Sequence, residues 1–174
     1  MKIWGCLLVL FSVCHLGNAQ DSTDRGYLVQ VGQMAPDDFS LKLNDGTTTS
    51  LKALRGKVVL LQFTASWCSV CRKEIPHLEK EIWQPDRSKG LVLIGVDRME
   101  SWDTVLAYHR QMRVDYPFAA DPGAEIFGRF AQKSAGVTRN VLIDRTGRIV
   151  FLTRLYDPSE FQELKHKVAS LLLR

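Results

Sequence analysis

The sequence predicts a layered α/β domain with a mixed central sheet. Two apolar runs, 58–63 and 91–96, have the near-continuous hydrophobicity of strands that are covered on both faces. An amphipathic segment at 71–83 separates them, and the order strand, helix, strand predicts parallel pairing through a right-handed crossover. Segments 140–143 and 148–153 flank a short turn and predict an antiparallel hairpin that extends the sheet.

The remaining elements follow from shorter patterns. Asp157 and Pro158 form a helix start, because an acidic cap followed by proline suits the free N–H groups of a first turn. Ser101 is a cap of the same kind for an earlier helix. The other predicted elements are a half-exposed strand at 38–43, a turn at 44–46, a return strand at 47–50, one helical turn at 50–54, a helix at 101–113, a strand at 116–120 and a short helix at 124–130.

The helix predicted at 71–83 has one clear buried face. Cys71, Ile75, Leu78 and Ile82 recur at helical spacing and form a single apolar stripe. Pro76 lies inside this helix, where its ring removes a backbone hydrogen bond, so we expect a kink.

The beginning of the chain predicts a secretory signal peptide. Lys2 is followed by a mostly apolar stretch at 3–13 that is too short to span a bilayer. Gly17 and Ala19 place small residues at the −3 and −1 positions of a cut after Ala19. A lipoprotein anchored through Cys14 and an uncleaved membrane anchor are the alternatives.

We divide the chain into a signal peptide at 1–19, a flexible lead-in at 20–31 and one domain at 32–174. An apolar content of 45% and a charged content of 24% are ordinary for a globular domain. The net charge of +4 is spread along the chain rather than clustered, so we expect no nucleic-acid partner. We expect the protein to be a monomer.

Two cysteines outside the signal peptide, Cys68 and Cys71, stand three positions apart at the start of the predicted helix. Such a pair can close a small disulfide ring, and a thiolate there is stabilised by the free N–H groups and partial positive charge of the helix N-terminus. A purely structural role is less favoured, because so small a loop gains little entropy from being closed. We expect no metal, because a lone pair of cysteines supplies half of a zinc site.

Glu74 is the third candidate for the chemistry. It follows Cys71 by three residues and precedes Leu78 by four, so it borders the apolar stripe. A carboxyl group at an apolar surface has a raised pKa, which suits a proton donor and acceptor for the thiols. The alternative is an ordinary solvated glutamate.

With these elements in order, the chain resembles exported thiol-disulfide oxidoreductases of the TlpA/ResA type, which have a thioredoxin fold. The resemblance runs from about Gly32 to Leu172. It is carried by Gly32, Ala35-Pro36-Asp37 and Phe39, by Gly56-Lys57-Val58-Val59-Leu60, by Trp67-Cys68-Ser69-Val70-Cys71, by Glu74 and Pro76, and by Val141-Leu142-Ile143-Asp144 with Gly147.

The resemblance implies a mixed central sheet with helices on both faces, N-terminal lead-in strands and a helix-strand insertion at about 101–120. It implies no cofactor beyond the disulfide itself. It also places Gln62 where thioredoxins have a buried acid, which shifts proton transfer toward Glu74. Trp67 is expected to cover the disulfide and to face partners, although a core role is the alternative.

Two positions depart from the family pattern. Ser69-Val70 stands between the cysteines, where members often have proline. Thr138 stands where the family has a cis-proline in the loop that faces the cysteines and binds substrate. We expect a cis Val137–Thr138 bond, with the Val137 backbone facing Cys68 and free to pair with an incoming chain.

The resulting hypothesis is an exported, periplasmic oxidoreductase that reduces disulfide-bearing partner proteins. Cys68 is the nucleophile, Cys71 resolves the mixed disulfide and Glu74 assists, while a membrane protein supplies electrons. Cytochrome c maturation is the setting that the resemblance implies. Two alternatives remain: a peroxiredoxin-like thiol peroxidase, and a redox-inert binding or metallochaperone module. The peroxidase pattern fits poorly, because Thr64 is four residues before Cys68 and no proline precedes it.

Overall fold

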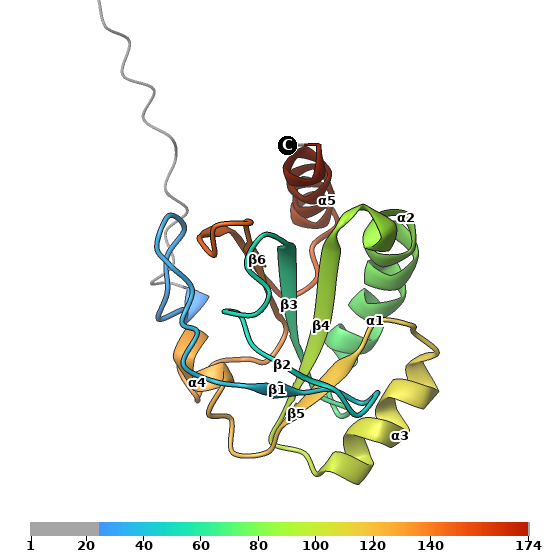
Figure 1. Cartoon of the computed structure of the whole chain (residues 1–174). Coiled ribbons are helices and arrows are strands. Elements are labelled where there is room, and N and C mark those ends of the chain that lie inside the picture. Colours follow the sequence, from blue (N-terminus) through green and yellow to red (C-terminus); the bar gives the residue numbers. More distant parts are fainter. Residues whose placement is uncertain (1–24, 174) are drawn as a thin grey trace, which may run out of the picture.

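The computed structural model describes residues 25–173 and shows a five-stranded mixed sheet (Figure 1). The strand order is β5-β4-β3-β6-β7. β3 (Val58–Thr64), β4 (Leu91–Arg98) and β5 (Phe118–Asp121) are parallel, whereas β6 (Arg139–Ile143) pairs antiparallel with β3, and β7 (Ile149–Arg154) pairs antiparallel with β6. The predicted parallel core and antiparallel hairpin are therefore confirmed.

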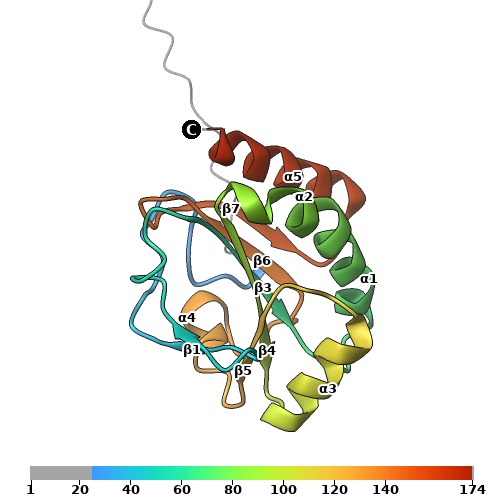
Figure 2. The same cartoon turned by 45° about the vertical axis from the view of Figure 1, so that its right-hand side comes forward.

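Each face of the sheet is covered by a different set of elements, as Figure 2 shows. One face packs against α1 (Ser69–His77), the π-helical segment η2 (Leu78–Trp83), α3 (Trp102–Met112) and α5 (Pro158–Leu172). The other face packs against α4 (Phe127–Phe130) and a small sheet of β1 (Leu41–Lys42) and β2 (Thr48–Thr49). Two short helical turns, α2 (Gln84–Asp86) and η3 (Arg87–Lys89), lead into β4. This is the mixed, two-sided arrangement of a thioredoxin fold.

The helix after β3 buries the predicted stripe and changes its winding after proline. Cys71, Ile75, Leu78 and Ile82 are all fully buried. Pro76 lies inside α1, and the chain continues from Leu78 as a π-helix rather than an α-helix. The irregularity expected at Pro76 thus takes the form of a wider helix immediately after it.

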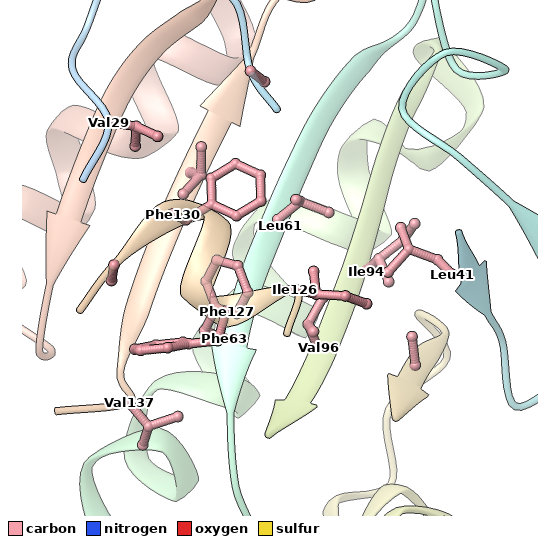
Figure 3. Close-up of a cluster of buried hydrophobic side chains, with 14 of the residues drawn as sticks. Val29, Leu41, Leu61, Phe63, Ile94, Val96, Ile126, Phe127, Phe130 and Val137 are labelled. Carbon is pink, nitrogen blue, oxygen red and sulfur yellow. The ribbon is translucent and has the colours of Figure 1, made fainter. Parts of the chain in front are cut away.

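The hydrophobic core between the central sheet and α4 is centred on three aromatic rings (Figure 3). Phe63 of β3 meets Phe127 edge to face, with ring centroids 5.3 Å apart, and also contacts Phe130 at 5.4 Å. An edge-to-face pair places the positive edge of one ring against the negative face of the other. This contact adds stability beyond that gained by burying the two rings. The contact fixes the strand that leads to the cysteines.

The chain joins the hydrophobic core before residue 32, where the sequence predicts that the domain begins. Tyr27 and Val29 are both buried in the core under α4. The Tyr27 hydroxyl shares its single proton between the backbone carbonyls of Asn140 and Thr153, and the Leu28 N–H donates to the Phe130 carbonyl. An aromatic ring can join the core in this way even where the surrounding sequence is polar. Within residues 25–173, no helix has the length and apolar character needed to cross a membrane.

Candidate active site

The two cysteines lie where β3 ends and α1 begins. Cys68 is the N-cap of α1, and its sulfur accepts a hydrogen bond from the Cys71 N–H at 3.2 Å. The two residues form a disulfide, with their Cα atoms 5.3 Å apart. Cys68 retains 8% of its exposure, whereas Cys71 has none. Cys68 is therefore the member of the pair that keeps some contact with solvent.

The turn that carries Cys68 is held by charged side chains on both sides. The Glu100 carboxylate accepts hydrogen bonds from the Ser66 N–H at 2.6 Å and from the Ser66 hydroxyl at 2.5 Å. The Arg72 guanidinium donates to the Ser66 carbonyl at 2.7 Å. Charge-assisted hydrogen bonds of this kind are stronger than neutral ones, so they keep the turn before Cys68 in place.

Thr138 lies directly against the disulfide, but its backbone differs from the expectation. Residues 25–173 contain no cis peptide bond, so the predicted cis bond between Val137 and Thr138 is wrong. A cis bond before a residue other than proline costs about 3–4 kcal/mol, and a trans backbone already brings the threonine hydroxyl to the sulfurs. Its Oγ1 lies 3.2 Å from the sulfurs of both Cys68 and Cys71.

The other two residues expected at the substrate face are placed differently from each other. Trp67 is 63% exposed beside Cys68. Val137 is buried in the core under α4, with 4% of its surface accessible. The Thr138 carbonyl accepts a hydrogen bond from the Leu155 N–H at 3.0 Å. The expected pairing of a partner chain with Val137 depended on the cis bond, so it does not follow from this backbone.

Glu74 is buried under α1 instead of being solvated. Its carboxylate accepts a hydrogen bond from the Asn140 side-chain amide at 2.7 Å, and that amide also donates to the Thr153 hydroxyl at 2.8 Å. Its second oxygen is buried and has no hydrogen-bond partner in the described chain. Burial raises the pKa of Glu74 to about 7, with the Asn140 hydrogen bond acting against the rise.

The pKa of Glu74 fits proton exchange near neutrality. A group that titrates near the working pH is available in both its acid and its base form. Gln62 is fully buried on the same face of the sheet, where its side-chain carbonyl accepts a hydrogen bond from Tyr116 at 3.2 Å. An amide does not titrate, so of these two buried residues only Glu74 can exchange a proton.

Asp97 is a buried carboxyl group that the sequence reasoning did not assign to the site. It is the last but one residue of β4 and pairs with Thr64 of β3. It is fully buried, and neither of its oxygens has a hydrogen-bond partner in residues 25–173. Burial and, to a smaller extent, the nearby Glu100 carboxylate together raise the pKa of Asp97 to about 9. The sequence does contain a sign of this burial. Side chains alternate between the two faces of a strand, so an acid that follows an apolar run points to the same interior as the residues two and four positions earlier.

The pH dependence of stability should reveal Asp97. Folding raises the pKa of the Asp97 carboxyl group, so the folded state binds its proton more tightly than the unfolded state does. The resulting contribution to the free energy of unfolding is complete below pH ~4 and is lost as the pH rises toward 9. Asp97→Asn should therefore raise the unfolding temperature, by more at pH 8–9 than at pH 5, in thermal melts across this range. The exposed Asp103→Asn is the matched control. A shift in the Asp97 variant that does not change with pH would contradict the assignment.

No three His, Cys, Asp or Glu side chains gather into a metal-binding group within residues 25–173. The groups described above are two sulfurs, one hydroxyl and one titrating carboxyl group. Together they can break and form a disulfide and move the proton that accompanies it.

Known proteins share both the sequence and this architecture. Residues 31–152 match the AhpC/TSA family. The thiol-disulfide oxidoreductase ResA of Bacillus cereus is 33% identical over 123 residues, covering 70% of this chain and 68% of that protein. A solved structure of a candidate protein disulfide isomerase from Bacteroides thetaiotaomicron is 52% identical, covers 86% of this chain and 94% of its own, and superposes with a TM-score of 0.82.

A candidate thiol:disulfide interchange protein DsbE from Chlorobium tepidum is 26% identical, covers 82% of this chain and 97% of its own, and has a TM-score of 0.70. The redox dithiol expected at the helix start and the thioredoxin fold are both consistent with these relatives. The chain belongs to the AhpC/TSA family and is a thioredoxin-fold thiol-disulfide oxidoreductase of the TlpA/ResA type.

Proposed function

We propose that the protein is an exported oxidoreductase that reduces disulfides of partner proteins, with Cys68 as nucleophile and Cys71 as resolving thiol. The unequal exposure of the two cysteines supports this order, because a partner disulfide can approach Cys68, which keeps some contact with solvent, but not Cys71, which has none. The helix N-terminus and the Cys71 N–H favour the thiolate form of Cys68.

The reaction proceeds by two exchanges. The Cys68 thiolate attacks one sulfur of the partner disulfide, and the other partner sulfur leaves as a thiolate. Cys71 then gives its proton to Glu74 and attacks Cys68, which releases the second partner sulfur and leaves Cys68 and Cys71 as a disulfide. The two electrons come from the dithiol, so each cycle needs a reductant, which we assign to a membrane electron donor.

Export is part of this proposal. It is supported by the pattern of residues 1–19, which lie outside the described residues, and by the type of oxidoreductase to which the chain belongs. An oxidising periplasm would hold the cysteines as a disulfide, so a reductase there depends on an outside electron source. Maturation of c-type cytochromes, whose haem attachment needs reduced thiols, is one process that fits such a reductase.

The peroxidase alternative shares the fold of this protein. A peroxidoxin, BcpB of Mycobacterium tuberculosis, superposes with a TM-score of 0.66, but its identity of 16% supports only a shared fold. The resolving thiol three residues away and the buried carboxyl group both suit exchange with a disulfide better than attack on a peroxide.

A paired assay tests the proposed activity. The protein should accelerate the reduction of insulin by dithiothreitol, and Cys68→Ser should abolish the acceleration. Peroxide consumption with the same reductant should stay at the uncatalysed rate. Peroxide turnover that depends on Cys68 would favour the peroxidase, and inactivity in both assays would favour a redox-inert binding module.

Trapping should identify the attacking sulfur. Cys71→Ser removes the resolving thiol, so mixed disulfides should accumulate on Cys68 and appear as reductant-sensitive bands after gel electrophoresis. Cys68→Ser should give none, because Cys71 is fully buried. Alkylation of the reduced protein at neutral pH should label Cys68 first. Preferential labelling of Cys71 would reverse the assignment.

The pH profile should report Glu74. Its raised pKa of about 7 means that the base form, which accepts the Cys71 proton, grows as the pH rises through 7. Glu74→Gln should remove this rise from the rate of insulin reduction between pH 6 and 8, and should lower the rate at pH 8 about tenfold or more. The exposed Glu163→Gln serves as the control. An unchanged profile in the Glu74 variant would exclude it from proton transfer.

A further inference from the structure

We propose that Thr138 is a catalytic residue whose hydroxyl donates a hydrogen bond to whichever sulfur carries negative charge during exchange. The inference rests on the dithiol chemistry of the proposed function. It starts from one contact: the Thr138 Oγ1 lies 3.2 Å from both sulfurs. A hydroxyl has a single proton to donate and can rotate to direct it. It can therefore serve the two sulfurs in turn without any movement of the backbone.

The surroundings of Thr138 leave the two sulfurs as the acceptors for its hydroxyl proton. The residue is 2% exposed, so water does not compete for the hydroxyl. The Leu155 N–H holds its carbonyl at 3.0 Å, and β6 begins at the next residue, so the position of the hydroxyl is fixed by the sheet. In the described chain, the two sulfurs are the only side-chain atoms to which Oγ1 is hydrogen-bonded.

The need for this donor differs between the two sulfurs. Cys68 also accepts the Cys71 N–H and lies at the cap of a helix. Within residues 25–173, the sulfur of Cys71 has only the Thr138 hydroxyl as a hydrogen-bond donor. A buried anion with no donor is strongly disfavoured, so the hydroxyl should matter most when Cys71 becomes a thiolate.

The contribution is therefore largest in the resolving step. The Cys71 proton moves to Glu74, the Thr138 hydroxyl donates to the new Cys71 thiolate, and that thiolate forms the bond to Cys68 as the Cys68–partner bond breaks. In the preceding step, the same hydroxyl supports the Cys68 thiolate. This role differs from that of a loop proline, which has no hydroxyl to donate.

Ellman's reagent separates the two steps optically. Attack by Cys68 on the reagent releases one coloured thiolate, and attack by Cys71 on the resulting mixed disulfide releases a second. In stopped-flow traces of the reduced protein, Thr138→Val should slow the second release about tenfold and the first release by less, because it keeps the shape but removes the hydroxyl. Thr138→Ser should keep both rates within about twofold of the original, because it retains the hydroxyl.

Equal second-phase rates in Thr138→Val and the unaltered protein, measured from pH 6 to 9, would overturn the inference. So would a Thr138→Ser variant as slow as the valine variant, since the methyl group would then be the essential part. If valine disturbs folding, Thr138→Ala tests the same loss without added branching. The assay contains no partner protein, so a protein that fails to reduce insulin but shows these rate changes would refute the proposed function and leave this inference standing.

Discussion

The pairing of β3 with β6 is the contact on which the whole site depends. Phe63 of β3 lies opposite Arg139 of β6, so the chain that leaves β3 toward the cysteines runs beside the chain that enters β6 at Thr138. One register thus brings the disulfide and the hydroxyl together. One step further along the same pair, Gln62 lies opposite Asn140, the residue that binds Glu74. A slip of one residue would turn each of these side chains to the other face.

The sequence predicted the elements with regular patterns and missed features that depend on contacts between distant segments. The buried strands, the hairpin and the stripe from Cys71 to Ile82 were read correctly, because hydrophobic periodicity is a local property. Glu74 was placed at the edge of that stripe, and it is buried with a raised pKa. The Val137–Thr138 bond was predicted wrongly, because the family's proline suggested a geometry that a threonine does not need.

Two buried carboxyl groups, Glu74 and Asp97, lie on the same face of the sheet as α1 and α3. Each retains at least one oxygen without a hydrogen-bond partner in the described chain, which is costly in a dry interior. Proteins retain such costs mainly at working sites, where a shifted pKa is useful. For Glu74 we propose proton exchange with the dithiol that begins the same helix. For Asp97 the structure gives a position beside the turn that carries Cys68, but no contact with a sulfur.

The complete burial of Cys71 has a kinetic consequence for the proposed reaction. If exchange begins at Cys68, the cysteine that keeps contact with solvent, then electrons enter and leave the protein through one sulfur atom. The reductant and the substrate would then be unable to occupy the protein together, and each would depart before the other arrives. Such an enzyme follows double-displacement kinetics, in which plots of reciprocal rate against reciprocal substrate concentration are parallel at different reductant concentrations. Either reactant in excess inhibits the enzyme, because it occupies the site that the other needs.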